Sequence, residues 1–403
     1  MAKTIFFNIP ATGHVNPSLP VIKELVERGE EVICVNTTEY KDKIEATGAH
    51  FYPYPDMGTM EQLIKNNAGD GNIPRNMRDL IRVAMTATPF ASELIADEKP
   101  DYIIFDTLAR WGKLAAKKHN LPQVSFCSTF VISADAMPPF PLPAILDTVG
   151  KMLVVLPSYI ADAIKMTAQQ GIFPGFLTDA VMSTGDLTLV FTSEAFQPAG
   201  ENFSEDYKFV GTSIAARPQD SDFPFEQLTG DKLVYISLGT LAHNPDFLKQ
   251  CLTAFADCDA QFVLSAGKQT NIAGLGTLPD NFIVRNFVPQ LEILERADAF
   301  ITHGGLNSVH ESLVYAVPML VLPQQVEQGV VALEVEKHEA GIALATAPPY
   351  KTPSVESLRE KLNTILASDK YKTNAAKLGQ TLTTAGGYLR AADEIQKFLA
   401  KHP

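Results

Sequence analysis

Two kinds of apolar spacing alternate along the N-terminal part of the chain. Residues 4–9, 31–37, 101–106 and 122–128 form short, mostly apolar runs, which are typical of strands buried on both faces. After the first run, apolar side chains recur at helical spacing at Leu19, Ile22, Leu25 and Val26. This pattern predicts a helix that opens at Asn16-Pro17 and ends at Gly29, and a second helix follows residue 106 through Lys118. Such an order indicates a parallel sheet covered by helices.

A second series of the same kind occupies the C-terminal half. Its apolar runs lie at residues 232–240, 260–267, 282–288, 298–305 and 318–323. The polar, proline-containing stretch 215–224 separates the two series. We therefore expect an α/β protein with two Rossmann-like domains, at residues 1–214 and 230–385, joined by a linker at 215–229. A helix follows at residues 386–403, and the ligands are expected in a cleft between the domains.

Composition excludes several classes of protein. The net charge of −13, with no cluster of Lys and Arg, argues against a nucleic-acid partner. No apolar run approaches the ~20 residues that a membrane span needs, and the first residues lack the apolar core of a signal peptide. The four cysteines form no CxxC pair, so free thiols and a cytoplasmic location are expected.

The most specific chemical signal is the segment THGGLNSVHES, residues 302–312. Its two glycines allow a tight turn before a helix, whose first N–H groups can hold a diphosphate. His303 can add a hydrogen bond to the same phosphates, and Glu311 can accept one from ribose hydroxyls. However, Ser308 and Glu311 also have the spacing of a helix capping box. Taken alone, the segment leaves both interpretations open.

A second candidate site joins His14, which follows the first predicted strand, to Asp106, which ends the fourth. A lone histidine is more often structural than catalytic. In the strand order 3-2-1-4-5 that is usual for such sheets, however, strands one and four are neighbours about 4.8 Å apart. Both side chains would then meet at one edge of the sheet. A carboxylate beside one ring nitrogen fixes the histidine tautomer and supports the imidazolium that forms when the other nitrogen takes a proton.

Three segments in the second half resemble the donor-binding region of the UDP-dependent glycosyltransferases. These are NFVPQLEIL at 286–294, HGGLNSVHE at 303–311 and PMLVLPQQVEQGVV at 318–331, in the family's order. IPATGHVNPSLPV near the start and SLGT at 237–240 are similar to the bacterial, macrolide-type members. The resemblance implies the GT-B fold, a C-terminal helix that returns to the N-terminal domain, and inversion at the anomeric carbon. It also implies a UDP-sugar co-substrate with no metal or other cofactor.

The same resemblance implies roles for individual residues. His14 and Asp106 would deprotonate the acceptor. The nucleoside would be bound by Phe287, Val288, Gln290 and, at the ribose, Glu311. The diphosphate would be held by His303, Gly305, Asn307 and Ser308. The phosphate and sugar would be reached by Ser237 and Thr240, and the sugar hydroxyls by Glu327 and Gln328.

The expected reaction is transfer of a sugar, glucose by preference, to a hydrophobic hydroxylated acceptor such as a flavonoid, another phenol, a macrolide or a steroid-like compound. The apolar region 129–184 and loops around Met57, Met60, Met77 and Met85 would line the acceptor side. A UDP-sugar epimerase of similar fold and a non-catalytic nucleotide-sugar binding protein are the alternatives. A NAD-dependent dehydrogenase is disfavoured because no G-x-G-x-x-G follows the first strand.

Overall fold

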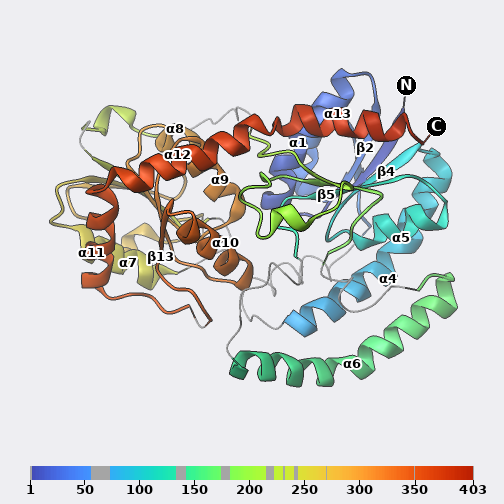
Figure 1. The fold of residues 1–403 in the computed structure, drawn as a ribbon, viewed down its shortest axis with the longest axis horizontal. Coiled ribbons are helices and arrows are strands. Elements are labelled where there is room, and N and C mark those ends of the chain that lie inside the picture. The colour runs from blue at the N-terminus through green and yellow to red at the C-terminus, as the bar shows by residue number, and fades with distance from the viewer. Residues whose placement is uncertain are drawn as a thin grey trace. The chain divides into compact units, whose positions relative to one another are not determined.

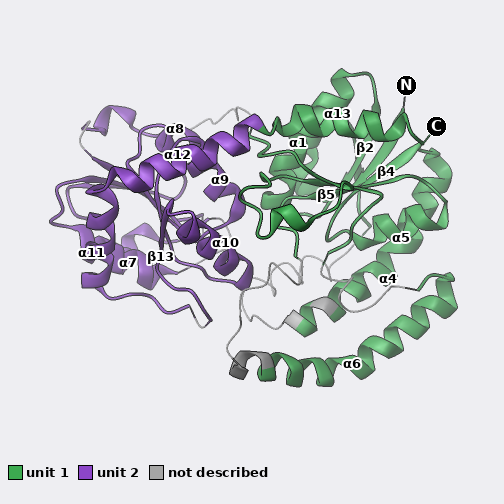
Figure 2. Ribbon diagram, in the orientation of Figure 1, with its two compact units in different colours: residues 1–215, 385–403 green, residues 216–384 purple. Residues whose placement is uncertain are grey.

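The chain forms two compact units, residues 1–215 with 385–403, and residues 216–384 (Figure 2). The computed structural model describes residues 2–55, 73–132, 142–173, 182–214, 222–229, 232–239, 244–268, 270–348 and 350–402. Each unit is built on one parallel sheet with helices packed against it (Figure 1). The predicted α/β class with two Rossmann-like sheets is confirmed.

The sheet of unit 1 has the strand order β3-β2-β1-β4-β5-β6-β7. Its strands are β1 Lys3–Phe7, β2 Glu31–Asn36, β3 His50–Pro53, β4 Tyr102–Asp106, β5 Gln123–Cys127, β6 Leu187–Val190 and β7 Tyr207–Phe209. Its helices include α1 Thr12–Glu27, α2 Lys41–Glu45, α4 Ile73–Glu98, α5 Arg110–Lys118, α6 Leu142–Gln170 and α13 Gly387–Leu399. The expected pairing of strands one and four is confirmed, with Phe7 beside Phe105.

Successive residues of these strands face opposite sides of the sheet, as the period of two requires. Phe6 and Ile104 pack in a core with α1 and α13, whereas Ile5 and Phe105 pack in a second core with α4 and α5. Both faces are therefore covered, which explains why the strand segments are apolar throughout.

The first helix begins earlier than the sequence predicts. The backbone N–H groups of His14 and Val15 both donate to the carbonyl of Ala11, so α1 starts at Thr12, and Pro17 lies inside it. The end of the helix is as predicted, because Gly29 has a φ of +90° and donates to Val26. His14 therefore lies in the first turn of a helix and not in the expected loop.

The sheet of unit 2 has the order β10-β9-β8-β11-β12-β13, again all parallel. Its strands are β8 Leu233–Ser237, β9 Gln261–Ser265, β10 Phe282–Arg285, β11 Ala299–Thr302, β12 Met319–Val321 and β13 Gly341–Ala343. Its helices include α7 Pro245–Phe255, α8 Gln290–Leu294, α9 Leu306–Val314, α10 Val326–Lys337, α11 Val355–Leu366 and α12 Asp369–Thr384.

The C-terminal segment returns to unit 1, as expected. After α12 the chain turns at Gly386 and Gly387, both with positive φ, and Gly387 N–H donates to the Val210 carbonyl at 2.6 Å. Helix α13 then packs against α1, where the Arg28 guanidinium lies 2.7 Å from Asp393. Ala391 and Ile395 complete the core on that side of the sheet.

The expected acceptor-side region contains the long helix α6, which lies beside α4 (Figure 1). Met57 and Met60 fall outside the described residues, as does the side chain of Met77. Although α6 is long, none of the helices in the described parts of the chain is both long and apolar enough to cross a membrane.

Candidate active site

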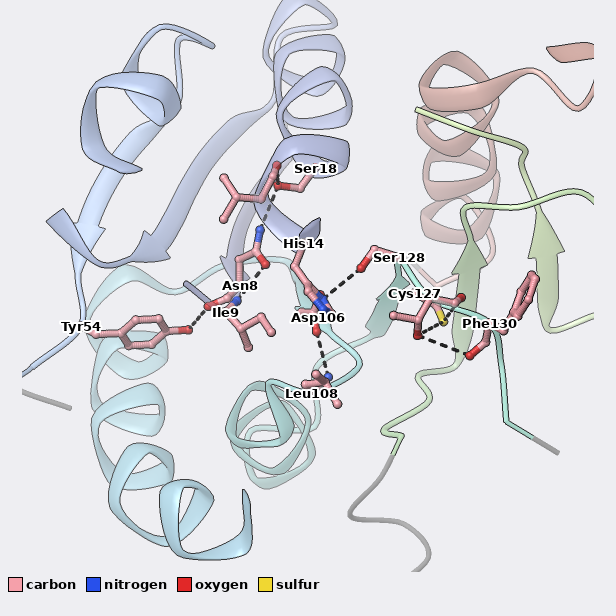
Figure 3. A network of polar contacts seen from close by, with 12 residues as sticks. Asn8, Ile9, His14, Ser18, Tyr54, Asp106, Leu108, Cys127, Ser128 and Phe130 are labelled. Atoms are coloured by element: carbon pink, nitrogen blue, oxygen red, sulfur yellow. Dashed lines mark hydrogen bonds and ion pairs between the residues drawn. The ribbon is translucent and has the colours of Figure 1, made fainter. Parts of the chain in front are cut away.

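The polar cluster of unit 1 lies at the carboxyl ends of β1, β4 and β5 (Figure 3). His14 Nδ1 is 2.7 Å from Asp106 Oδ2, so the structure brings the two predicted residues together. The Asp106 side chain is fully buried, whereas that of His14 is 14% exposed. The second carboxylate oxygen, Asp106 Oδ1, accepts from the backbone N–H of Leu108 at 2.9 Å. Both oxygens are thus held, which fixes the carboxylate relative to the imidazole.

A third residue, which the sequence analysis did not single out, also contacts His14. Ser128 Oγ lies 2.9 Å from the same Nδ1 (Figure 3). Ser128 directly follows β5, the neighbour of β4, and therefore emerges at the same edge of the sheet as Asp106. Ser128 could have been predicted from the sequence, because it is a polar residue at the end of the strand next to that of Asp106.

The segment between β1 and α1, which positions the helical turn carrying His14, is fixed by the buried side chain of Asn8. Its Nδ2 donates to Ser18 Oγ on α1 at 2.9 Å, and its Oδ1 accepts from the N–H of Ile9 at 2.8 Å. The hydroxyl of Tyr54 donates to the Asn8 carbonyl at 2.8 Å. The end of β1, the first turns of α1 and the segment after β3 are therefore tied together behind the histidine (Figure 3).

This arrangement suits general-base chemistry. Asp106 and Ser128 both contact Nδ1, so a proton exchanged with a substrate would use Nε2. The buried carboxylate favours the tautomer with its proton on Nδ1 and stabilises the positive ring that results from proton uptake.

In unit 2, His303 lies between two glycines that follow neighbouring strands. A Cβ atom at Gly239 would lie 2.7 Å from the ring carbon Cε1, and one at Gly305 would lie 2.6 Å from Nε2. From the sequence, the glycines of this loop are predicted to let the backbone approach a ligand. In the structure, Gly305 together with Gly239 also allows the backbone to enclose the imidazole.

His303 is uncharged near neutral pH. Burial lowers its pKa to about 4, and its enclosed Nδ1 has no hydrogen-bond partner among the described residues. It can therefore offer a phosphate a hydrogen bond but not a positive charge.

The helix start beside His303 tests the capping-box interpretation of residues 302–312. Helix α9 begins at Leu306, with Gly305 as its N-cap and no capping hydrogen bond from that residue. Ser308 is thus the third residue of the helix, and the capping-box interpretation is wrong. Glu311 instead accepts from Gln290 Nε2 at 2.5 Å, and the same amide donates to Ser308 Oγ at 3.3 Å.

Tyr235 joins this network, because its hydroxyl donates to Gln290 Oε1 at 3.1 Å. Tyr235 is not among the residues predicted from the sequence, because it lies inside the apolar strand β8, where no polar neighbour distinguishes it. Since Gln290 follows β10 and Glu311 lies on α9, the network connects two of the three segments that carry the family resemblance.

The remaining candidates of unit 2 differ in their surroundings. Val288 is buried, whereas the Phe287 side chain is 55% exposed beside it. Ser237 ends β8 and lies beside Thr302 of β11. Glu327 and Gln328 lie in the first turn of α10, where Gln328 Oε1 accepts from the N–H of Gln324 at 2.8 Å. Asn307 is the second residue of α9, and Thr240 lies outside the described residues.

The buried histidines make stability depend on pH. Burial lowers the pKa of the fully buried His310 to about 3, below the 6.5 of the unfolded chain. Between these values the unfolded chain binds a proton that the folded chain does not, so stability falls as the pH falls. We expect His310→Gln to reduce the loss of unfolding free energy between pH 7.5 and 5.0 by about 2 kcal/mol. Chemical denaturation at both pH values measures this, and an unchanged loss would contradict it.

Comparisons with known proteins identify the family of this chain. Residues 249–385 match the family model described as "Erythromycin biosynthesis protein CIII-like, C-terminal domain". An uncharacterized UDP-glucosyltransferase, YojK of Bacillus subtilis (strain 168), is 36% identical over 405 residues, which cover 98% of this chain and 97% of that protein. The oleandomycin glycosyltransferase of Streptomyces antibioticus is 30% identical over 100% of this chain and 92% of its own length.

A crystal structure of the glycosyltransferase of kitacinnamycin superposes with a TM-score of 0.83 at 26% identity, covering 98% of this chain and 99% of that one. The named relatives are glycosyltransferases, not epimerases or binding modules. The chain therefore belongs to the family of macrolide and natural-product glycosyltransferases with the GT-B fold, enzymes that transfer a sugar from a nucleoside diphosphate to a small-molecule acceptor.

Proposed function

We propose that the protein transfers glucose from UDP-glucose to a hydroxyl of a hydrophobic small molecule, with inversion at the anomeric carbon. The observation that carries the proposal is the contact of 2.7 Å between His14 Nδ1 and the buried carboxylate of Asp106. A base of this kind serves to remove a proton from an acceptor hydroxyl. A protein that only binds nucleotide sugars would have no use for it.

The donor is proposed from the relatives and from the network of unit 2. The relative YojK is described as a UDP-glucosyltransferase, which supports uridine and glucose. In this proposal Val288 and Phe287 contact the uracil, and Glu311 and Gln290 bind the ribose and nucleoside. The N-terminus of α9, with His303, Gly305, Asn307 and Ser308, holds the diphosphate. The sugar and its phosphate are contacted by Ser237, Thr240, Glu327 and Gln328.

A substitution of Glu311 tests the ribose assignment. Glu311→Ala is expected to weaken UDP binding on the order of 10-fold, because a carboxylate-to-hydroxyl hydrogen bond is lost. Calorimetry on the folded variant gives the affinity, and a melting curve gives its stability. Glu292→Ala, on α8, serves as a control. A lowered melting temperature with unchanged UDP affinity would return Glu311 to a purely structural role, as a partner of Gln290.

The acceptor is proposed from the apolar surroundings of the base. Phe130, Val131 and the half-exposed Ile132 come shortly after Ser128 in the chain, following Thr129. Two of the relatives carry the names oleandomycin and kitacinnamycin in their descriptions. A flavonoid, another phenol, a macrolide or a steroid-like compound would suit such surroundings, because each combines a hydroxyl with a large apolar body.

In the proposed reaction, His14 Nε2 takes the proton of the acceptor hydroxyl while Asp106 stabilises the imidazolium. The hydroxyl oxygen forms a bond to the anomeric carbon as the bond between that carbon and the diphosphate oxygen breaks. UDP leaves with the electron pair, and the N–H groups at the start of α9 stabilise its charge. Bringing the two reactants together in line supplies much of the acceleration.

The stereochemistry of the product tests this single displacement. UDP-glucose carries an α-linked sugar, so direct attack from the opposite side gives a β-glucoside. Proton NMR of the purified product distinguishes the two anomers by the coupling of the anomeric proton. An α-linked product would rule out the single displacement and leave the family assignment standing.

Metal independence is a further prediction. No group of three or more His, Cys, Asp or Glu residues in the described ranges is arranged to hold a metal ion. With a helix N-terminus proposed for the diphosphate, we expect unchanged turnover after dialysis against EDTA. UDP release measured with EDTA, and again with added magnesium or manganese, checks this. Loss of activity that magnesium or manganese restores would contradict the prediction.

A further inference from the structure

The hydroxyl of Tyr54 makes two hydrogen bonds inside unit 1. It donates to the backbone carbonyl of Asn8 at 2.8 Å and accepts from the indole Nε1–H of Trp111 at 3.1 Å. Both aromatic side chains are buried, and a buried hydroxyl is costly unless it is bonded. Here its donor and its acceptor function are both used. The hydroxyl therefore connects the backbone after β1 to the first turn of α5, and we call this connection the Tyr54 bridge.

The two segments that the Tyr54 bridge joins carry His14 and Asp106. Asn8 directly follows β1, and His14 comes six residues later, in the first turn of α1. On the other side, Trp111 comes five residues after Asp106, the last residue of β4. The backbone pairing of β1 with β4 ends one residue before Asp106. Past that point, the spacing of the two segments depends on contacts outside the sheet, and the bridge is such a contact.

The path from the bridge to each of the two residues is short and hydrogen-bonded. The carbonyl of Asp106 accepts from the N–H of Ala109 at 2.7 Å, and the carbonyl of Ala109 accepts from the N–H of Gly112 at 2.9 Å. A Cβ atom at Gly112 would lie 2.8 Å from the Cβ of Phe105, so α5 lies directly against β4. On the other side, the Asn8 side chain donates to α1. A displacement at either end of the bridge would therefore move His14 relative to Asp106.

Packing alone does not require this hydroxyl. The Tyr54 ring lies edge-on to Trp111, with centroids 5.8 Å apart and an interplanar angle of 82°, and its centroid is 6.1 Å from that of Phe90. A phenylalanine would fill the same space. Burial raises the pKa of Tyr54 well above its ordinary value, so the hydroxyl keeps its proton and the bridge persists over the pH range of an assay. If the hydroxyl only satisfied two buried polar groups, its removal would lower stability and leave the chemistry unchanged.

We propose that Tyr54 is a positioning residue of the active site, whose hydroxyl keeps His14 Nδ1 within hydrogen-bond distance of Asp106. The proposal rests on the role proposed above for His14 as the base. The contact of 2.7 Å between Nδ1 and Oδ2 tolerates little displacement, since hydrogen bonds weaken steeply when distance and angle change. When that contact loosens, part of the imidazole population carries its proton on Nε2. A ring in that tautomer cannot take the acceptor proton at Nε2.

Turnover of two acceptors tests the proposal. Tyr54→Phe should lower turnover of an aliphatic alcohol roughly 10-fold and turnover of an acidic thiophenol less than about 2-fold, because a misplaced base matters only where a proton has to be removed. Tyr102→Phe is the matched control. Tyr102 is also buried and donates from its hydroxyl, to Glu30, but it lies at the opposite end of β4 from Asp106. Melting curves show that both variants fold. Equal losses of Tyr54→Phe with the two acceptors, or the same losses in Tyr102→Phe, would overturn the proposal.

A measurement without substrate separates this proposal from the proposed function. In protein with isotope-labelled histidine, NMR at alkaline pH, where the imidazole is uncharged, reports which ring nitrogen carries the proton. The His14 signals are identified by their loss in His14→Ala. Wild type and Tyr102→Phe should carry the proton on Nδ1, whereas Tyr54→Phe should carry it partly on Nε2. Trp111→Phe opens the bridge at its other end and should change the His14 signals in the same direction.

The outcomes of the NMR measurement are distinct. Unchanged His14 signals in Tyr54→Phe and Trp111→Phe would overturn the positioning role, whatever reaction the protein catalyses. Altered signals in a protein that glucosylates no acceptor would contradict the proposed function and leave the positioning role standing.

Discussion

Replacing His14 by alanine is expected to lower turnover by roughly 10²–10⁴-fold, the usual contribution of a positioned general base. UDP affinity should stay nearly unchanged, because the proposed nucleotide residues all lie in unit 2. The loss should be smaller for an acidic phenol or a thiol, which arrives partly deprotonated and needs less help. Turnover of the variant and of wild type across acceptors of graded acidity, at fixed pH, measures both effects.

Two companion variants separate the base from its support. Asp106→Asn should lower turnover less than His14→Ala does. The imidazole remains, but the carboxylate that fixes its tautomer and stabilises its positive charge is gone. Ser128→Ala removes the other contact to Nδ1 and should cost less than Asp106→Asn, because it removes no charge. If His14→Ala lowered turnover by the same factor with an aliphatic alcohol as with a thiophenol, His14 would not be the group that takes the proton.

A methyl group at Gly305 is expected to weaken UDP binding roughly 10- to 100-fold. The backbone of Gly305 has a φ of −61°, which alanine adopts without strain. The variant therefore tests only whether the site has room for a methyl group. The added Cβ would lie 2.6 Å from His303 Nε2, and the ring or the start of α9 has to move. Overpacking of this size costs about 1–3 kcal/mol, and here it falls on the proposed diphosphate site.

The double variant Gly305→Ala/His303→Ala identifies the cause. With the imidazole gone, the methyl group has room, so the double variant should bind UDP no more weakly than His303→Ala alone. Calorimetric titration of the three variants with UDP gives the comparison. If the double variant lost as much UDP affinity as the two single variants together, alanine at position 305 would act on the backbone of the loop and not through His303.

Much of the fold could be predicted because the strands are buried on both faces. Apolar runs such as residues 4–9 and 101–106 leave few alternatives to a parallel sheet, and the usual strand order then makes β1 and β4 neighbours. That adjacency places His14 and Asp106 at the same edge of the sheet. The segment 302–312 could also be recognised from the sequence, because Gly304 and Gly305 mark a turn that precedes a helix.

Other features depend on contacts that no local pattern reveals. The predicted start of α1 is wrong because Pro17 suggests a first helical position. In the structure the helix begins earlier, since the N–H groups of His14 and Val15 both donate to the Ala11 carbonyl. Ser128 and Tyr235 reach their partners through the register of neighbouring strands. The capping-box interpretation of Ser308 is wrong because the helix begins two residues before it, at Leu306.

The most direct test of the proposed function is UDP release from UDP-glucose with and without an added acceptor. Purified protein is incubated with UDP-glucose and a panel of hydroxylated aromatic, macrolide and steroid-like compounds, and both UDP and the glucosylated product are quantified. We predict little UDP release without an acceptor, and with a suitable acceptor one glucosylated molecule for each UDP released. Release of UDP at the same rate without any acceptor, or conversion of UDP-glucose to another UDP-sugar, would contradict the proposal.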